Sequence, residues 1–122
     1  MTHAVNWFEI PVTDMNRAKA FYTQTMQIEL RDETMDGMDM AIFPHSEDGV
    51  GGSLTTGPHY QPGPNGTVVY LNVGADIDAP LSRVESAGGK VVLPKLHISP
   101  EIGHIAIIED SEGNHIGLHS PN

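Results

Sequence analysis

The chain has 122 residues, with 16 Asp and Glu against 6 Lys and Arg, no cysteine, and a formal net charge of −10. This length fits one compact domain, and so negative a surface repels phosphate backbones and anionic lipid, so we expect neither nucleic-acid binding nor membrane binding. The missing cysteines exclude disulfides, thiolate metal sites and cysteine nucleophiles, and the absence of a long apolar run or a secretory signal predicts a cytoplasmic protein.

The first half of the chain is expected to form a strand, a helix and three further strands. Apolar residues alternate with others from Phe8 to Val12, which is the period of a strand. Asp14 predicts the N-cap of a helix of about three turns. The buried face of this helix is predicted from its spacing to be Ala18, Phe21, Tyr22 and Thr25. The three strands after it are expected at residues 28–33, 38–43 and 53–56. Asp36-Gly37 is a hairpin-turn signal between the first two.

The segment 57–66 holds three Pro and three Gly, and we interpret it as a linker between modules 1–57 and 66–122. After it, Asp76 or Asp78 predicts the start of a second helix, and Gly88-Gly89 predicts its end. The apolar stripe of that helix is formed by Ile77, Leu81 and Val84. The strands of this half are expected at residues 67–73, 90–93, 104–109 and 115–118, with the last turn at 112–114.

The two halves share the same order of elements and look like an internal duplication. Val12 and Val73 occupy equivalent positions, 61 residues apart, in the first strand of each half. In the last strand of each half, Leu54 and Leu118 are equivalent and 64 residues apart. The sequence therefore predicts an α+β fold of two βαβββ modules.

A set of segments spread over nearly the whole chain has a characteristic order and spacing. They are residues 7–14 running into Arg17-Ala18 and Phe21-Tyr22, then 51–54, 69–73 and 88–91, and finally the Asp-Ser-Glu-Gly-Asn sequence at 110–114 with 115–118. In these segments the sequence resembles the vicinal oxygen chelate superfamily, which includes glyoxalase I, bleomycin-resistance proteins and extradiol dioxygenases. The resemblance implies curled mixed sheets around a shared cavity, and a homodimer that completes this cavity by pairing modules between chains.

Metal-dependent members of that superfamily hold a divalent ion with four side chains, two from each module. Carried onto this chain, those positions are Trp7, Ser53, Val68 and Gly117. None of the four is a ligand of the expected type, because an indole, a neutral hydroxyl, an alkyl group and a hydrogen do not suit a divalent ion. We therefore expect no metal and no other cofactor at the usual place. The alternative is a divalent metal at a non-standard site, such as Glu9 with a histidine.

Strand alternation predicts which side chains share a face with those four positions and line the cavity. The candidate ligand-binding residues are Trp7, Glu9, Ser53, Val68, Tyr70, Asn72, His115 and His119. Aromatic faces with a few polar groups are typical of small-molecule pockets. Glu9 beside a histidine is a candidate general base.

Each of these residues also has a purely structural interpretation. Trp7 can be a core or interface anchor, and Glu9 can pair with Arg31 or Lys90. His3, His45 and His59 are expected to be solvent-exposed near the terminus or in loops. The segment 57–66 can cover the mouth of the cavity or be a plain linker.

The sequence therefore favours a protein that binds a small, planar or partly apolar organic ligand without metal. An acidic surface favours cationic ligands, as in bleomycin-resistance-like members. The alternative is a glyoxalase-like lyase or isomerase, or a dioxygenase-type enzyme, acting without metal or with a relocated one. In the lyase or isomerase version Glu9 is the base, and a histidine or Tyr70 steadies an enolate.

Overall fold

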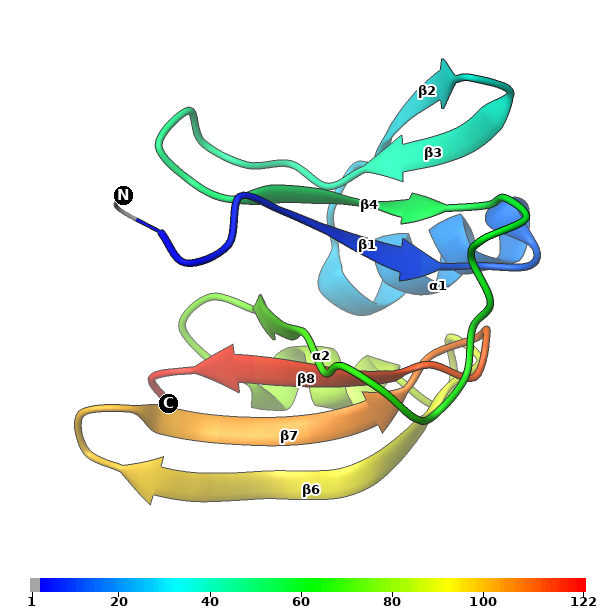
Figure 1. The fold of residues 1–122 in the computed structure, drawn as a ribbon. Helices are drawn as coiled ribbons and strands as arrows, with labels where there is room; N and C mark the ends of the chain where they lie inside the picture. The colour runs from blue at the N-terminus through cyan, green and yellow to red at the C-terminus, as the bar shows by residue number, and fades with distance from the viewer. Residues whose placement is uncertain (1–2) are drawn as a thin grey trace.

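The structure is a computed structural model that describes residues 3–122, and each half of the chain folds into one sheet with one helix (Figure 1). The elements of the first half are β1 (Trp7–Pro11), α1 (Met15–Met26), β2 (Arg31–Met35), β3 (Met38–Ile42) and β4 (Gly51–Thr55). Those of the second half are β5 (Tyr70–Asn72), α2 (Asp78–Arg83), β6 (Lys90–Ser99), β7 (Gly103–Glu109) and β8 (His115–Ser120). Neither helix is long and apolar enough to cross a membrane.

Both sheets are mixed and have the same topology, which confirms the predicted α+β fold of two βαβββ modules. The strand orders are β1-β4-β3-β2 and β5-β8-β7-β6, and in each sheet the first and last strands of the module pair in parallel. The Val12 N–H donates to the Thr55 carbonyl at 3.0 Å, and the Val73 N–H donates to the His119 carbonyl at 3.1 Å. These equivalent bonds reproduce the offsets of 61 and 64 residues. The sheets stay open and do not close into a barrel.

Helix α1 follows the sequence signals closely. The Asp14 carboxylate accepts a hydrogen bond from the backbone N–H of Arg17 at 3.1 Å, which satisfies one of the free donors of the first turn. The helix ends where Gln27 adopts a left-handed φ of 56°. All four residues of the predicted stripe are buried, namely Ala18, Phe21, Tyr22 and Thr25. This stripe packs into a core shared by both sheets and both helices.

The other elements agree with the predicted order but differ in extent. Asp36 and Gly37 have φ of 51° and 76°, as the expected two-residue hairpin turn requires. Helix α2 has only six residues, and Asp76 accepts from the Asp78 N–H at its start. Strand β6 runs to Ser99, well past the expected end at residue 93. β2 begins at Arg31, three residues later than expected.

The turn between β7 and β8 ties the second module to the first. The Glu112 carboxylate accepts from the backbone N–H groups of Thr13 and Asp14 and is paired with Arg17, with Oε2 2.6 Å from Arg17 Nε. The Asn114 Nδ2 donates to the Pro11 carbonyl at 2.8 Å. This part of the Asp-Ser-Glu-Gly-Asn sequence is therefore a clasp that fixes the two modules relative to each other.

Candidate functional site

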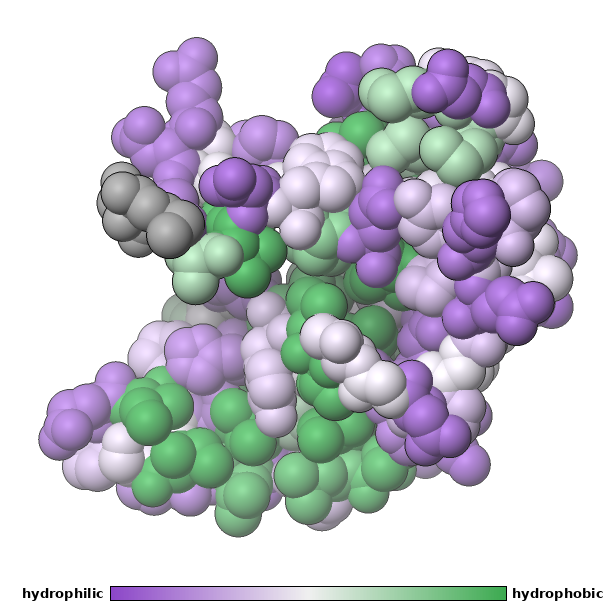
Figure 2. All heavy atoms as spheres, in the orientation of Figure 1, coloured by the Kyte–Doolittle hydropathy of each residue, from purple (hydrophilic) through white to green (hydrophobic). Residues whose placement is uncertain are grey.

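A groove of about 880 Å³ lies where β1 and β5 run past each other, between the two modules. Figure 2 shows the molecule hollowed between its upper and lower parts, which in Figure 1 are the first and second sheets. Five of the eight candidate ligand-binding residues line it, namely Trp7, Glu9, Val68, Tyr70 and Asn72. We call this the seam groove. Its lining comes from both modules, so it depends on how the clasp holds them.

Two aromatic rings in the seam groove lie flat on the sheets because glycines stand opposite them. Trp7 is directly across from Gly51, where an added Cβ would lie 2.9 Å from the indole. Tyr70 is directly across from Gly117, and its ring covers that glycine's α-carbon. The exposed fractions of Trp7 and Tyr70 are 41% and 47%, so both offer a π-face to a ligand.

A second groove of about 440 Å³ adjoins the first, and Glu9, Thr67, Val68 and Val69 line both. Its other walls are the linker around Pro62 to Asn65 and the start of β8 with His115. The His115 Nε2 lies 3.4 Å from the Glu109 carboxylate, across the β7–β8 ladder. The candidate residues Glu9 and His115 therefore face one space, although no contact joins them directly.

The other two candidate residues lie outside both grooves. Ser53 is fully buried, and its Oγ lies 2.7 Å from the Thr55 hydroxyl. His119 is held by the turn after β6, with Nε2 2.6 Å from the Ile102 carbonyl oxygen. Both are occupied by contacts within the protein, so in this structure neither is presented to a ligand.

Glu9 contacts neither Arg31 nor Lys90. Its Oε1 accepts a hydrogen bond of 2.6 Å from the hydroxyl of Tyr60, a residue of the linker. This hydrogen bond, with smaller effects from burial and from the Glu9 charge, raises the pKa of Tyr60 above its ordinary value. The linker thus reaches into the site and holds its carboxylate.

The four positions that bind metal in metal-dependent superfamily members do not fit an ion here. The Trp7 indole covers Gly51, the Ser53 hydroxyl is bonded to Thr55, and the Tyr70 ring covers Gly117. Val68 has no donor atom. Within residues 3–122, no group of three or more His, Cys, Asp or Glu side chains is arranged to hold a metal elsewhere.

The ligand-binding residues predicted from the sequence do not include two residues of this region, His45 and Tyr60, although Tyr60 belongs to the segment 57–66 that can cover the mouth of the cavity. The His45 ring also lies over Gly51, where an added Cβ would come within 2.6 Å of it, and it lines the seam groove. It is exposed, as a loop histidine is expected to be, yet it stands at the mouth of the groove. The glycine across from Trp7 is the sequence signal that could have indicated space for a second ring there.

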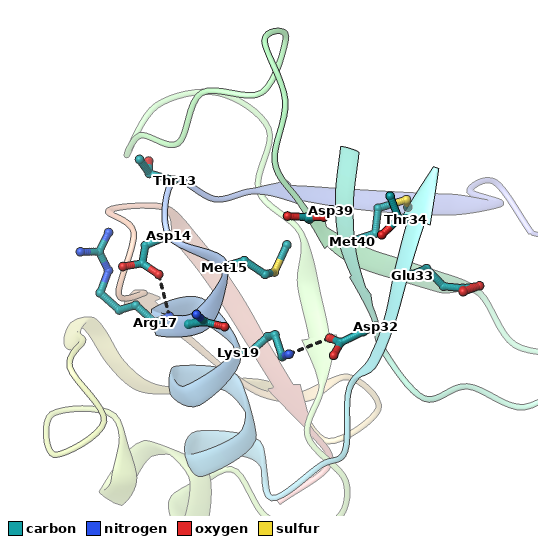
Figure 3. Close-up of a pocket in the computed structure, with 11 residues that line it drawn as sticks. Thr13, Asp14, Met15, Arg17, Lys19, Asp32, Glu33, Thr34, Asp39 and Met40 are labelled. Carbon is teal, nitrogen blue, oxygen red and sulfur yellow. Dashed lines mark hydrogen bonds and ion pairs between the residues drawn. The ribbon is translucent and has the colours of Figure 1, made fainter. Parts of the chain in front are cut away.

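A third groove, of about 720 Å³, lies on the outside of the first module between α1 and the β2–β3 hairpin (Figure 3). Its walls are strongly charged, and the Lys19 ammonium is already paired with Asp32 at 2.7 Å. Arg17, at its other end, is held by Glu112. No candidate residue from the sequence lines it, so we take the seam groove as the candidate site.

The family comparison agrees with this architecture. Residues 4–118 match the sequence profile of the Glyoxalase/Bleomycin resistance protein/Dioxygenase superfamily. The chain belongs to this superfamily. No curated protein sequence matches the chain.

Solved structures place the chain among superfamily members of similar size. TnmS3, an antibiotic-binding protein from Streptomyces sp. CB03234, is 29% identical with a TM-score of 0.70, over 100% of this chain and 98% of that one. A glyoxalase/bleomycin resistance protein from the same organism is 28% identical with a TM-score of 0.69, over 93% and 97% of the two chains. The fosfomycin resistance protein FosX from Listeria monocytogenes shares the fold at 15% identity and a TM-score of 0.69, over 100% and 94%.

Proposed function

We propose that this protein binds a small, flat, partly apolar organic molecule in the seam groove and acts by holding it. The observation that carries the proposal is the pair of exposed rings, Trp7 and Tyr70, which come from different modules and flank one groove. Rings held on glycines lose little conformational freedom when a planar ligand stacks on them. The likeness to TnmS3, which is described as an antibiotic-binding protein, supports the same class of function.

We further propose that this binding needs no metal ion. An indole, a bonded hydroxyl, an alkyl group and a covered glycine stand at the four positions that would coordinate one, namely Trp7, Ser53, Val68 and Gly117. Binding then depends on stacking, apolar contact and the single carboxylate of Glu9. Adding or chelating divalent ions is expected to leave ligand affinity unchanged.

Replacing Trp7 with alanine is expected to weaken ligand binding at least tenfold, because it removes one of the two stacking faces. We suggest proflavine, a planar aromatic cation, and acridine, its neutral counterpart, as probes. Trp7 is the only tryptophan, so quenching of its fluorescence reports occupancy of the groove in the wild type. Isothermal titration calorimetry provides the comparison with the variant.

Met35→Ala is the matched control, since Met35 is exposed on β2 away from the groove. Both variants should keep the wild-type circular dichroism spectrum and melting temperature within a few degrees. Equal affinities for wild type and Trp7→Ala would refute the seam groove as the binding site.

We propose that the protein forms a homodimer through the open face of its second sheet. Figure 2 shows apolar residues gathered on the lower part of the molecule, over the second sheet. The exposed apolar side chains there include Leu96 and Ile98 on β6 and Ile102 in the turn that follows. Burying such a face stabilises association by about 25 cal/mol per Å².

Leu96→Glu is expected to convert the dimer into a monomer, because it places a carboxylate on the apolar face. Light scattering coupled to size-exclusion chromatography should give twice the chain mass of 13.2 kDa for the wild type and one chain mass for the variant. Met35→Glu adds the same charge to the first module and should remain dimeric. A wild-type protein that elutes as a monomer at high micromolar concentration would contradict the proposal.

A further inference from the structure

The linker residue Tyr60 is hydrogen-bonded to the carboxylate of Glu9, a residue of the candidate site. Its hydroxyl donates to Glu9 Oε1 at 2.6 Å. Glu9 is the only Asp, Glu, Lys or Arg among the described residues that line the seam groove and the adjoining groove. A ligand that forms an ion pair with these lining residues must therefore form it with Glu9. The Glu9 carboxylate is already hydrogen-bonded to Tyr60.

The linker holds Tyr60 over the site from two anchor points. On one side, the Tyr60 N–H donates to the Gly57 carbonyl at 3.1 Å, and the ring packs against the Gly57 α-carbon next to Met38. On the other side, the Gly63 N–H donates to the Asn114 Oδ1 at 3.0 Å. Between these anchors, the only side-chain hydrogen bond that residues 58–62 make to other described residues is that of Tyr60 to Glu9. The tyrosine side chain can therefore swing away at the cost of this hydrogen bond and of its packing at Gly57, while the backbone of the linker stays attached at both ends.

The chemistry of the pair decides which ligands can open it. An ionised carboxylate only accepts hydrogen bonds, so a competitor for Glu9 must be a donor. A cationic N–H donor forms a charge-assisted bond with a carboxylate, and this bond is stronger than that of a neutral phenol. Neutral or anionic ligands gain nothing by displacing Tyr60. The net charge of −10 further favours the approach of cations.

We propose that Tyr60 is a latch on Glu9 that a planar ligand with a protonated amine or amidine group displaces on binding. This inference rests on the proposed function and adds to it the ligand class and the residue that sets selectivity. Only molecules in which the Tyr60–Glu9 bond is open can bind the ligand through Glu9. The apparent affinity is therefore the intrinsic affinity multiplied by the open fraction. The raised pKa of Tyr60 agrees with a hydroxyl that stays protonated as the donor.

Tyr60→Phe tests the latch because it keeps the ring and removes only the bond to Glu9. We expect it to tighten proflavine binding about three- to tenfold and to leave acridine binding unchanged, measured by calorimetry near pH 8 where acridine is neutral. Glu9→Gln should reduce proflavine affinity to the level of acridine. Met35→Ala is the matched control, since Met35 is exposed on β2 and lines neither groove, and it should change neither affinity by more than twofold.

A second measurement needs no ligand. Chymotrypsin cleaves after aromatic residues, so cleavage after residue 60, identified by fragment mass, should accelerate in both Tyr60→Phe and Glu9→Ala, which remove the bond, and not in Met35→Ala. Unchanged cleavage at this bond overturns the latch. Dye binding that Tyr60→Phe leaves equal or weakens overturns the latch and leaves the proposed function standing. A wild-type protein and variants that bind neither dye overturn both.

Discussion

Asp110→Ala is expected to lower the free energy of unfolding by about 3–5 kcal/mol, the range for removing one partner of a buried charged network. Asp110 is buried in the turn between β7 and β8, and its carboxylate accepts four hydrogen bonds. The donors are the Tyr22 hydroxyl at 2.6 Å, the backbone N–H groups of Glu112 and Asn114 at 2.9 Å each, and the Asn114 side-chain amide at 3.1 Å.

Without the carboxylate, these donors stay buried and unpaired, and the turn that carries the clasp loses its shape. Domains of this size are stabilised by about 5–15 kcal/mol, so such a loss is a large share of the total. Equilibrium unfolding in urea, followed by circular dichroism, measures it.

Tyr22→Phe separates the phenol from the rest of this network. Burial and the neighbouring Asp110 carboxylate raise the pKa of Tyr22 well above its ordinary range, so the hydroxyl is a permanent donor. Removing it deletes one of the four bonds and leaves the turn intact, with an expected cost of about 1–2 kcal/mol. If Asp110→Ala costs no more than Tyr22→Phe, then the carboxylate does not organise the turn.

The parts of the fold that sequence predicts well are those fixed by local chemistry. Asp14 caps α1 by accepting a hydrogen bond from the backbone N–H of Arg17, only three residues away. Asp36-Gly37 can form the hairpin turn because both residues tolerate positive φ. The duplication is recognised by comparing short patterns in the two halves of the chain. Equivalent hydrogen bonds at Val12 and Val73 reproduce its offsets. Order and type of the elements follow from such signals.

The lengths of elements depend on partners that are distant in sequence. Strand β6 continues past residue 93 because β7 lies beside it as far as Gly103, with shifts in register that accommodate Pro94 and its neighbours. A proline normally argues against a continuing strand, and here it lies at the sheet edge, where its missing N–H costs no ladder bond. Helix α2 stops at six residues although its apolar stripe extends to Val84.

In the candidate site, too, local patterns predict some residues correctly, whereas contacts with distant residues cannot be predicted from them. Alternation along β1 puts Trp7 and Glu9 on one face, and both line the seam groove. The same rule selects Ser53 and His119, but cannot reveal that Thr55 and the Ile102 carbonyl already engage them. Tyr60 lies 51 positions from Glu9, in a segment without regular structure, so no periodicity leads to their contact. Only the path of the linker in three dimensions does.

The clasp residue Glu112 is expected to make the stability of the protein depend on pH in the acid range. Burial by itself raises the pKa of Glu112, but the hydrogen bonds from Arg17 and from the backbone N–H groups of Asp14 and Thr13 outweigh it and lower the pKa to about 2. In the unfolded chain the ordinary value of 4.5 applies. The folded state therefore binds the proton more weakly, and the stabilisation is fully present above about pH 4.5.

As the pH falls from about 4.5 to about 2, this stabilisation is lost, and we expect the free energy of unfolding to drop by about 2–3 kcal/mol from Glu112 alone. Glu112→Gln cannot ionise, so it should be less stable than the wild type by a similar amount at pH 7, and the difference should shrink as the pH approaches 2. Glu85→Gln, at an exposed site in the turn after α2, should follow the wild-type curve at every pH. Urea unfolding at several pH values gives all three curves. Parallel curves for Glu112→Gln and the wild type would mean that the charge on Glu112 does not join the modules, and that the neutral hydrogen bonds of the clasp suffice to hold the seam groove together.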